Sequence, residues 1–136
     1  MSQTLSQTEV DAVLALPADA RFDYFIKQVV ADGQVWGLVS DRGWSLAAVG
    51  EQACLALWPH QQFAAACALE AWADTVPQAL NLDQFKLLLE QLDQQDTPVA
   101  VFMTPSAQGS VVAPEDLWNS LWACLQEELA RYGVDT

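Results

Sequence analysis

His60 is the only histidine in this chain of 136 residues, and an imidazole is the side chain that most readily changes charge near neutral pH. It could act as a general base or contact a ligand if a carboxylate such as Asp41 or Glu51 lies beside it. It also follows Trp58 and Pro59 at the start of an expected helix, where the ring can simply cap the helix or pack. No serine or cysteine close to it in sequence is an obvious nucleophile. We therefore assign no catalytic residue.

The cysteines and the loop serines show no pattern typical of reactive sites. Cys54, Cys67 and Cys124 are odd in number, lie in apolar or helical surroundings, and form neither a CxxC pair nor a zinc-binding spacing with a histidine. We expect buried, reduced thiols, with no metal and no cofactor. Ser106 and Ser110 flank a glycine, but neither GxSxG nor the phosphate-binding GxxxxGK pattern is present. They are expected to belong to an ordinary loop.

The segment from Val35 to His60 is the most unusual part of the sequence, because it holds three of the six tryptophans. Indoles on a sheet face can fill a core, line a pocket or anchor a partner. For Trp36 and Trp44 we favour the core and keep a pocket wall or a partner anchor as alternatives. Asp41 is expected at a hairpin tip, where aspartate favours a turn through hydrogen bonds to its own backbone.

Composition predicts one soluble globular domain that spans residues 1–136. Hydrophobic residues make up 52% of the chain and charged residues 17%, which excludes a disordered polar segment. A chain of this length suits a single domain with a well-filled core.

The charge balance excludes two classes of partner. Eighteen acidic residues and five basic residues give a formal net charge of -13 at pH 7, and no Lys/Arg cluster could follow a phosphate backbone or lipid headgroups. We expect no binding to nucleic acid or membrane. The first residues lack the basic region of a secretory signal, and no run of eighteen apolar residues occurs. We therefore expect a cytoplasmic protein, most economically a bacterial one.

Periodicity and capping signals predict an α+β fold. The expected order is α-α-β-β-β-α-α-β-α, with a mainly antiparallel sheet of about four strands packed with helices. The helices are expected over residues 8–16, 17–32, from 59 on, 81–92 and 114–132, and the strands over 35–40, 44–48, 53–58 and 99–104. The last strand is apolar throughout and should be central in the sheet.

The turn residues Ser40–Gly43 predict the register of the first hairpin. A type I turn with Gly43 in the left-handed conformation would give a three-residue loop that pairs Ser40 with Trp44. Leu38 would then face Leu46, and Trp36 would share the core face with Trp44. A two-residue loop would instead place the two indoles on opposite faces.

Local patterns give further expectations. Gly33 should end the second helix. Arg21 is placed on the polar face of this helix with Asp23 and Lys27, which are spaced to form an ion pair. Pro77 is expected in a loop that leads to a helix cap at Asn81. Residues Pro105–Val112 are expected to form an exposed loop.

Several short motifs in this order resemble one family. They are VWGL, the DxGW turn, LWPH before a helix, and the AVFMTP strand, and the similarity runs from Phe22 to the final helix. The chain resembles the family of small bacterial proteins catalogued as domain of unknown function 2750. This resemblance implies a shared architecture but no assigned activity and no catalytic residues.

Two functions are compatible with these observations. The favoured one is a non-enzymatic protein-interaction module, because aromatic residues are abundant and catalytic groups are few. The alternative is a small-ligand-binding protein or enzyme with a pocket around the single histidine and the tryptophan cluster. Homo-oligomers are also plausible, because the final helix has a wide apolar stripe with Trp118 and Trp122. The candidate ligand or partner-binding residues are Trp36, Asp41, Trp44, Trp58, Pro59 and His60.

Overall fold

The computed structural model describes residues 5–69, 72–105 and 107–131. Ala71, Ser106, Tyr132 and Gly133, which the sequence placed in helices and a loop, lie outside the described residues. The helices are α1 (Gln7–Leu14), α2 (Ala18–Asp32), α3 (Gln61–Ala66), α4 (Leu82–Gln94) and α5 (Pro114–Arg131). The strands are β1 (Gln34–Ser40), β2 (Gly43–Trp44), β3 (Leu46–Val49), β4 (Gln52–Leu57), β5 (Val76–Asn81), β6 (Val99–Val101) and β7 (Ser110–Val112).

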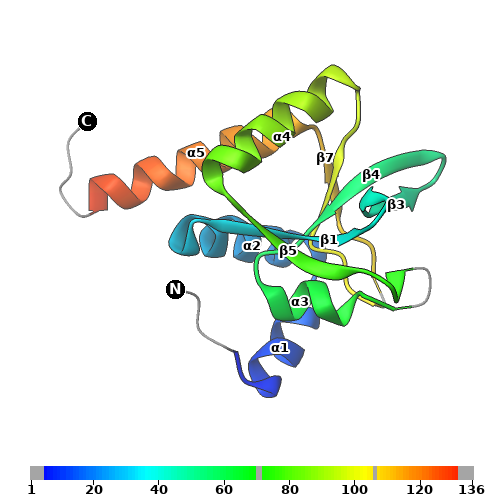
Figure 1. Cartoon of the computed structure of the whole chain (residues 1–136). Helices are drawn as coiled ribbons and strands as arrows, with labels where there is room; N and C mark the ends of the chain where they lie inside the picture. Colours follow the sequence, from blue (N-terminus) through cyan, green and yellow to red (C-terminus); the bar gives the residue numbers. More distant parts are fainter. Residues whose placement is uncertain (1–4, 70–71, 106, 132–136) are drawn as a thin grey trace.

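The strands form two sheets, and the α+β class is confirmed (Figure 1). One sheet has the order β2-β1-β5 and the other has the order β3-β4-β6-β7. All pairs in them are antiparallel except β4 with β6. Strand β6 lies between two neighbours and is at most 1% exposed, as its continuous apolar sequence predicted.

Two strands were missed by the sequence analysis. The segment around Pro77 was expected to be a loop, but it is strand β5, which pairs with β1 over six positions from Gln34↔Asn81 to Val39↔Val76. Since β5 is an edge strand, it tolerates a proline that would break a central one. Residues 110–112 were expected in the exposed loop, but they form β7 against β6. Neither strand has a strong local signal, and both are held by long-range pairing.

The hairpin between β1 and β2 has another register than expected. Val39 pairs with Trp44, so the loop holds only two residues, 41 and 42. Trp44 therefore lies on the face of Gly37, opposite the face of Trp36. A Cβ added to Gly37 would lie 2.7 Å from Trp44 Cζ3, so the indole covers this glycine directly. The prediction that both indoles point to the same face was wrong.

The register differs because the chain leaves the first sheet directly after Trp44. Leu46 pairs with Leu55 of β4 in the second sheet, and it is 48% exposed. The two sheets meet at Trp36 and Trp58, which exchange two backbone hydrogen bonds of 2.9 Å and 2.8 Å. The β1–β2 connection is thus a short link between sheets and not a full hairpin.

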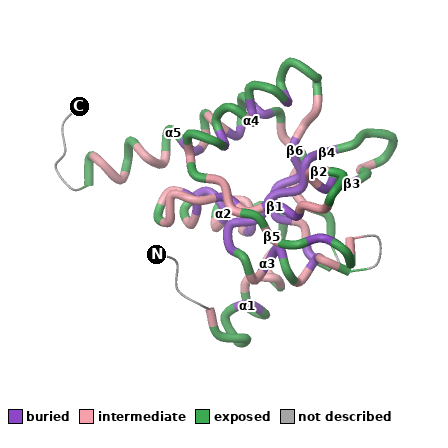
Figure 2. Tube along the Cα trace, viewed as in Figure 1, coloured by how far each residue is buried: buried purple, intermediate pink, exposed green. Residues whose placement is uncertain are grey.

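The core lies between the sheets and the helices (Figure 2). Its largest fully buried side chains include Trp58, Phe25 and Phe63, whereas Trp36 and Trp44 are half-buried and pack against its edge. The core role expected for these two indoles therefore belongs mainly to Trp58.

Helices α2, α4 and α5 pack together, and α5 contacts both of the others. Gly33 ends α2 in the left-handed conformation, with φ of 68°, as expected. Asn81 and Gln84 form the predicted cap of α4, in which each side chain accepts a hydrogen bond from the other residue's backbone N–H. The last turns of α5 project beyond the helices on which it packs (Figure 1).

Candidate functional site

The corner Trp58-Pro59-His60 is buried. Trp58 is 0% exposed and His60 is 5% exposed, and Pro59 is also buried. The indole nitrogen of Trp58 donates to the backbone oxygen of Met103 at 2.9 Å. Contact with a partner through these three side chains would require their exposure, so a surface has to be sought elsewhere.

The histidine caps a helix. His60 Nδ1 accepts a hydrogen bond from the backbone N–H of Gln62 at 3.3 Å, and its ring packs edge-on against Phe63 with centroids 6.3 Å apart. Asp41 and Glu51 are exposed, in the tight β1–β2 and β3–β4 turns. From the strand rise, each lies roughly 20 Å along the sheets from the histidine. The structure therefore does not bring the histidine and these carboxylates together.

The three cysteines are free thiols; Cys54 and Cys67 are buried as expected, but Cys124 on α5 is only half-buried. Cys67 is buried and its Sγ donates to the backbone oxygen of Met103 at 3.5 Å. Burial raises the pKa of the Cys67 thiol to about 11, and it also raises the pKa of Cys54 and Cys124. Thiols of this kind are poor nucleophiles at neutral pH. Across the described ranges, no group of three or more His, Cys, Asp or Glu side chains is placed to hold a metal ion.

Arg21 is buried, which the sequence analysis did not foresee. It is 3% exposed, and its guanidinium donates to the backbone oxygens of Leu16 at 3.0 Å, of Phe102, and of Gln108 at 3.3 Å. Burial lowers the pKa of this guanidinium. The placement on the polar face was wrong, and spacing could have shown this. Arg21 lies four and eight residues before Phe25 and Val29 on the buried stripe of α2.

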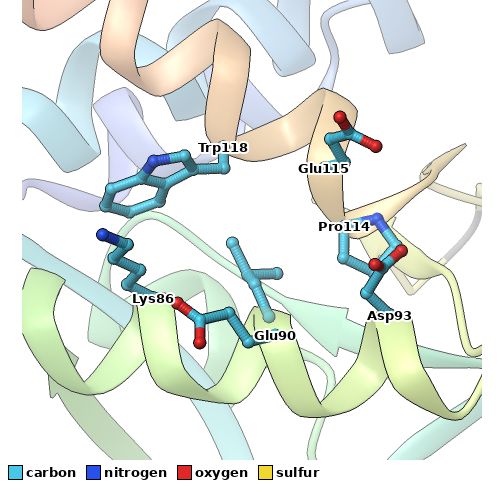
Figure 3. A pocket seen from close by; sticks show the side chains of 7 residues that line it. Lys86, Glu90, Asp93, Pro114, Glu115 and Trp118 are labelled. Atoms are coloured by element: carbon cyan, nitrogen blue, oxygen red, sulfur yellow. The ribbon is translucent and has the colours of Figure 1, made fainter.

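A cleft of about 300 Å³ lies between α4 and α5. We call it the α4–α5 cleft (Figure 3). The residues that line it are Lys86, Leu89, Glu90, Asp93, Pro114, Glu115 and Trp118. Lys86 reaches from α4 toward Trp118 on α5, and its Nζ lies 5.9 Å from the centre of the indole. The cleft therefore combines an aromatic surface, a cation and three carboxylates.

Local sequence explains how this cleft is formed. Lys86, Glu90 and Asp93 follow one another at spacings of four and three residues, which places them on one face of α4. Pro114 is the first residue of α5, where a missing N–H costs nothing, and Glu115 lies in its first turn. Trp118 follows one turn later on the same face as Glu115. The two walls of the cleft thus come from two separate helices.

The electrostatics of the cleft favour a cation. Its three carboxylates outnumber the single ammonium of Lys86. Asp93 lies in the last turn of α4 and Glu115 in the first turn of α5, so the two helix dipoles oppose each other here and the carboxylates set the charge of the cleft. A positively charged group from another molecule would be stabilised at this place.

A smaller cleft of about 220 Å³ lies beside the β1–β2 turn. Trp44 lines it together with Trp72, Asp74 and Thr75. His60 lines neither this cleft nor the α4–α5 cleft.

No helix of the described residues is long and apolar enough to cross a membrane. A comparison with curated proteins finds no match. The family model described as "Protein of unknown function (DUF2750)" matches residues 22–121, which include both helices of the α4–α5 cleft as far as Leu121. The match covers well over half of the chain and agrees with the resemblance carried by the VWGL, DxGW and LWPH motifs, and the chain therefore belongs to the DUF2750 family.

Proposed function

We propose that this protein is a non-enzymatic protein-interaction module that binds a basic segment of a partner protein in the α4–α5 cleft. The observation that carries this proposal is Lys86. An ammonium already lies 5.9 Å from the Trp118 ring, in a cleft that also holds three carboxylates, so the site has the chemistry that stabilises a cation.

The charge of the whole chain supports the same partner chemistry. A net charge of -13 repels acidic molecules and steers basic ones toward the surface. The small number of candidate catalytic groups supports binding over catalysis. His60 caps a helix, and burial raises the pKa of all three cysteines, which makes their thiols poor nucleophiles.

Energetics favours a polypeptide over a single small cation. A cation over an exposed indole contributes about 0.5–1 kcal/mol, and an exposed ion pair contributes about 0–1 kcal/mol. A useful affinity of about 1 μM requires about 8 kcal/mol. The partner must therefore add further contacts outside the cleft.

Fluorescence titration with a synthetic peptide rich in arginine tests this proposal, with an acidic peptide of equal length as a negative control. We expect the basic peptide to bind, and the double variant Glu90→Gln, Asp93→Asn to lower its affinity by about tenfold, as two lost charge contacts imply. The matched control is Asp41→Asn, which removes an exposed carboxylate from the remote β1–β2 turn.

The outcomes separate the alternatives. No binding of the basic peptide would overturn the proposal. A loss of binding free energy in Asp41→Asn that is half the loss in the double variant, one charge against two, would show that only net charge matters. A loss confined to Asp41→Asn would move the binding site to the β1–β2 turn.

A further inference from the structure

Helix α5 has an apolar stripe that the rest of the protein covers incompletely. Leu117 and Leu121 are buried, and Trp118 and Leu125 are half-buried. Trp122 is 51% exposed, although an indole is among the largest apolar side chains. The stripe is therefore covered on one side by α2 and α4 and open on the other.

A shallow apolar depression of about 20 Å³ lies where α5 meets α2 and α4. We call it the α5 groove, and it is lined by Val30 at the end of α2, Leu82 at the start of α4, and Trp118, Leu121, Trp122 and Leu125 on α5. Trp118 lines both this groove and the α4–α5 cleft. An apolar strip and an acidic cleft therefore form one continuous surface along α5.

A second copy of this chain does not suit this surface. Each copy carries a net charge of -13, and α5 itself bears Glu127 and Glu128 beside its apolar stripe. The chain also has few cations to offer. Arg21 is buried, Lys27 and Arg131 are in ion pairs with acids of their own helices, and Lys86 is already in the cleft. The fifth basic residue, Arg42, is exposed in the β1–β2 turn. The negative charge on both copies therefore opposes their association through this face.

The walls of the groove indicate the conformation of the partner. They are three helices, so no free strand edge in the groove could add an extended peptide by backbone pairing. Grooves between helices bind amphipathic helices through apolar anchors spaced by one turn.

From these observations we infer that the partner segment is a basic amphipathic helix that lies along α5. This inference rests on the function proposed above and names the kind of partner. One basic residue enters the α4–α5 cleft, and apolar residues on the same face cover Trp122 and Leu125. Glu115 and Leu125 are separated by about 15 Å along the helix axis at 1.5 Å per residue, so the partner helix needs about three turns.

Two synthetic peptides of 15 residues test the inference. Both contain the same arginine, lysine, leucine and alanine residues, but only one places its leucines at helical spacing, with an arginine one turn before the first leucine. The other has the order scrambled. We expect fluorescence anisotropy to give at least a tenfold tighter Kd for the amphipathic peptide, and circular dichroism to show that this peptide becomes helical when bound.

Variants assign the two parts of the surface. Trp122→Ala is expected to remove the preference for the amphipathic peptide and to leave binding of the scrambled peptide unchanged. Since Trp122 is half-exposed, this variant should fold, which its own circular dichroism checks. The matched control is Leu87→Ala, which truncates another exposed apolar residue, at 62% exposure, that does not line the groove. Glu90→Gln with Asp93→Asn is expected to weaken both peptides.

The results distinguish this inference from the proposed function. Equal binding of both peptides, still weakened by the acid variants, would overturn the helical partner and leave the basic partner standing. No binding of either peptide would overturn both. Light scattering that shows a dimer, lost in Trp122→Ala, would assign the groove to a second copy and overturn the inference.

Discussion

Replacement of Arg21 is the most informative test of how the fold is held together. Its guanidinium joins α2 to a distant segment through the backbone oxygens of Phe102 and Gln108, and it also donates to the backbone oxygen of Leu16, just before α2. Hydrogen bonds from a charged donor contribute about 1.5–3 kcal/mol each. Arg21→Met also removes the cost of burying a charge, which offsets part of this sum. We expect a net loss of about 3–5 kcal/mol, a large share of a typical stability of about 5–15 kcal/mol.

Arg21→Lys sharpens this prediction. Lysine keeps the buried charge, but its compact ammonium cannot reach three oxygens that lie in different directions. The loss should therefore be at least as large as in Arg21→Met. Lys27→Met is the matched control on the same helix, because Lys27 is exposed and only pairs with Asp23 at 3.0 Å, and it should lower stability much less.

Urea denaturation followed by tryptophan fluorescence measures these losses. Hydrogen exchange adds a local readout, since the amide of Phe102 bonds to Leu57 at 2.8 Å and should exchange faster once Arg21 is removed. Phe102 holds a left-handed conformation, with φ of 59°, which costs energy and needs such support. The reasoning fails if both Arg21 variants remain within about 1 kcal/mol of the parent protein, below the net worth of one such hydrogen bond.

Three further predictions concern packing, the cleft and pH. Gly109→Ala should lower the melting temperature more than Gly37→Ala. The new methyl at Gly109 would lie 2.5 Å from the Val101 backbone oxygen, whereas at Gly37 its nearest neighbour is the Trp44 indole, a side chain that can shift. The reverse order of melting temperatures would contradict this packing. Lys86→Met should raise the affinity for a basic peptide by about two- to fivefold in fluorescence titrations, because it removes a competing cation from Trp118. A weaker affinity would instead mean that Lys86 itself contacts the partner. Burial raises the pKa of Cys67 to about 11, so the stability that its protonated thiol contributes is complete below the ordinary thiol pKa and is lost as the pH rises toward 11. Urea titrations should show this decline, and Cys67→Ala should flatten it; an equally steep decline in that variant would exclude the thiol as its source.

Short-range signals explain which expectations the structure confirms. The cap at Asn81, the stop at Gly33 and the ion pair of Asp23 with Lys27 each involve residues at most four positions apart. Their geometry follows from one turn of helix, whatever the rest of the chain does. The α+β class and the buried β6 strand follow from periodicity in the same way.

The candidate site could not be predicted in this way, because its parts come from different elements. Trp118 and the wide stripe of α5 were visible in the sequence, but Lys86 and Asp93 gain their meaning only when α4 packs beside α5. The burial of Trp58 and His60 likewise depends on segments more than forty residues away, such as Met103, which accepts a hydrogen bond from the Trp58 indole.

The amino-acid sequence by itself determined the helices, their caps, the apolar central strand, the acidic surface and the family. Tertiary structure decided the pairing of β5 with β1, the face of Trp44, the distant oxygens that Arg21 binds and the α4–α5 cleft. The reason is the distance in sequence between the residues that make each kind of contact. A helix forms from contacts within four residues, but sheet register and clefts depend on which distant segments meet, and a shift of one residue turns every side chain to the other face.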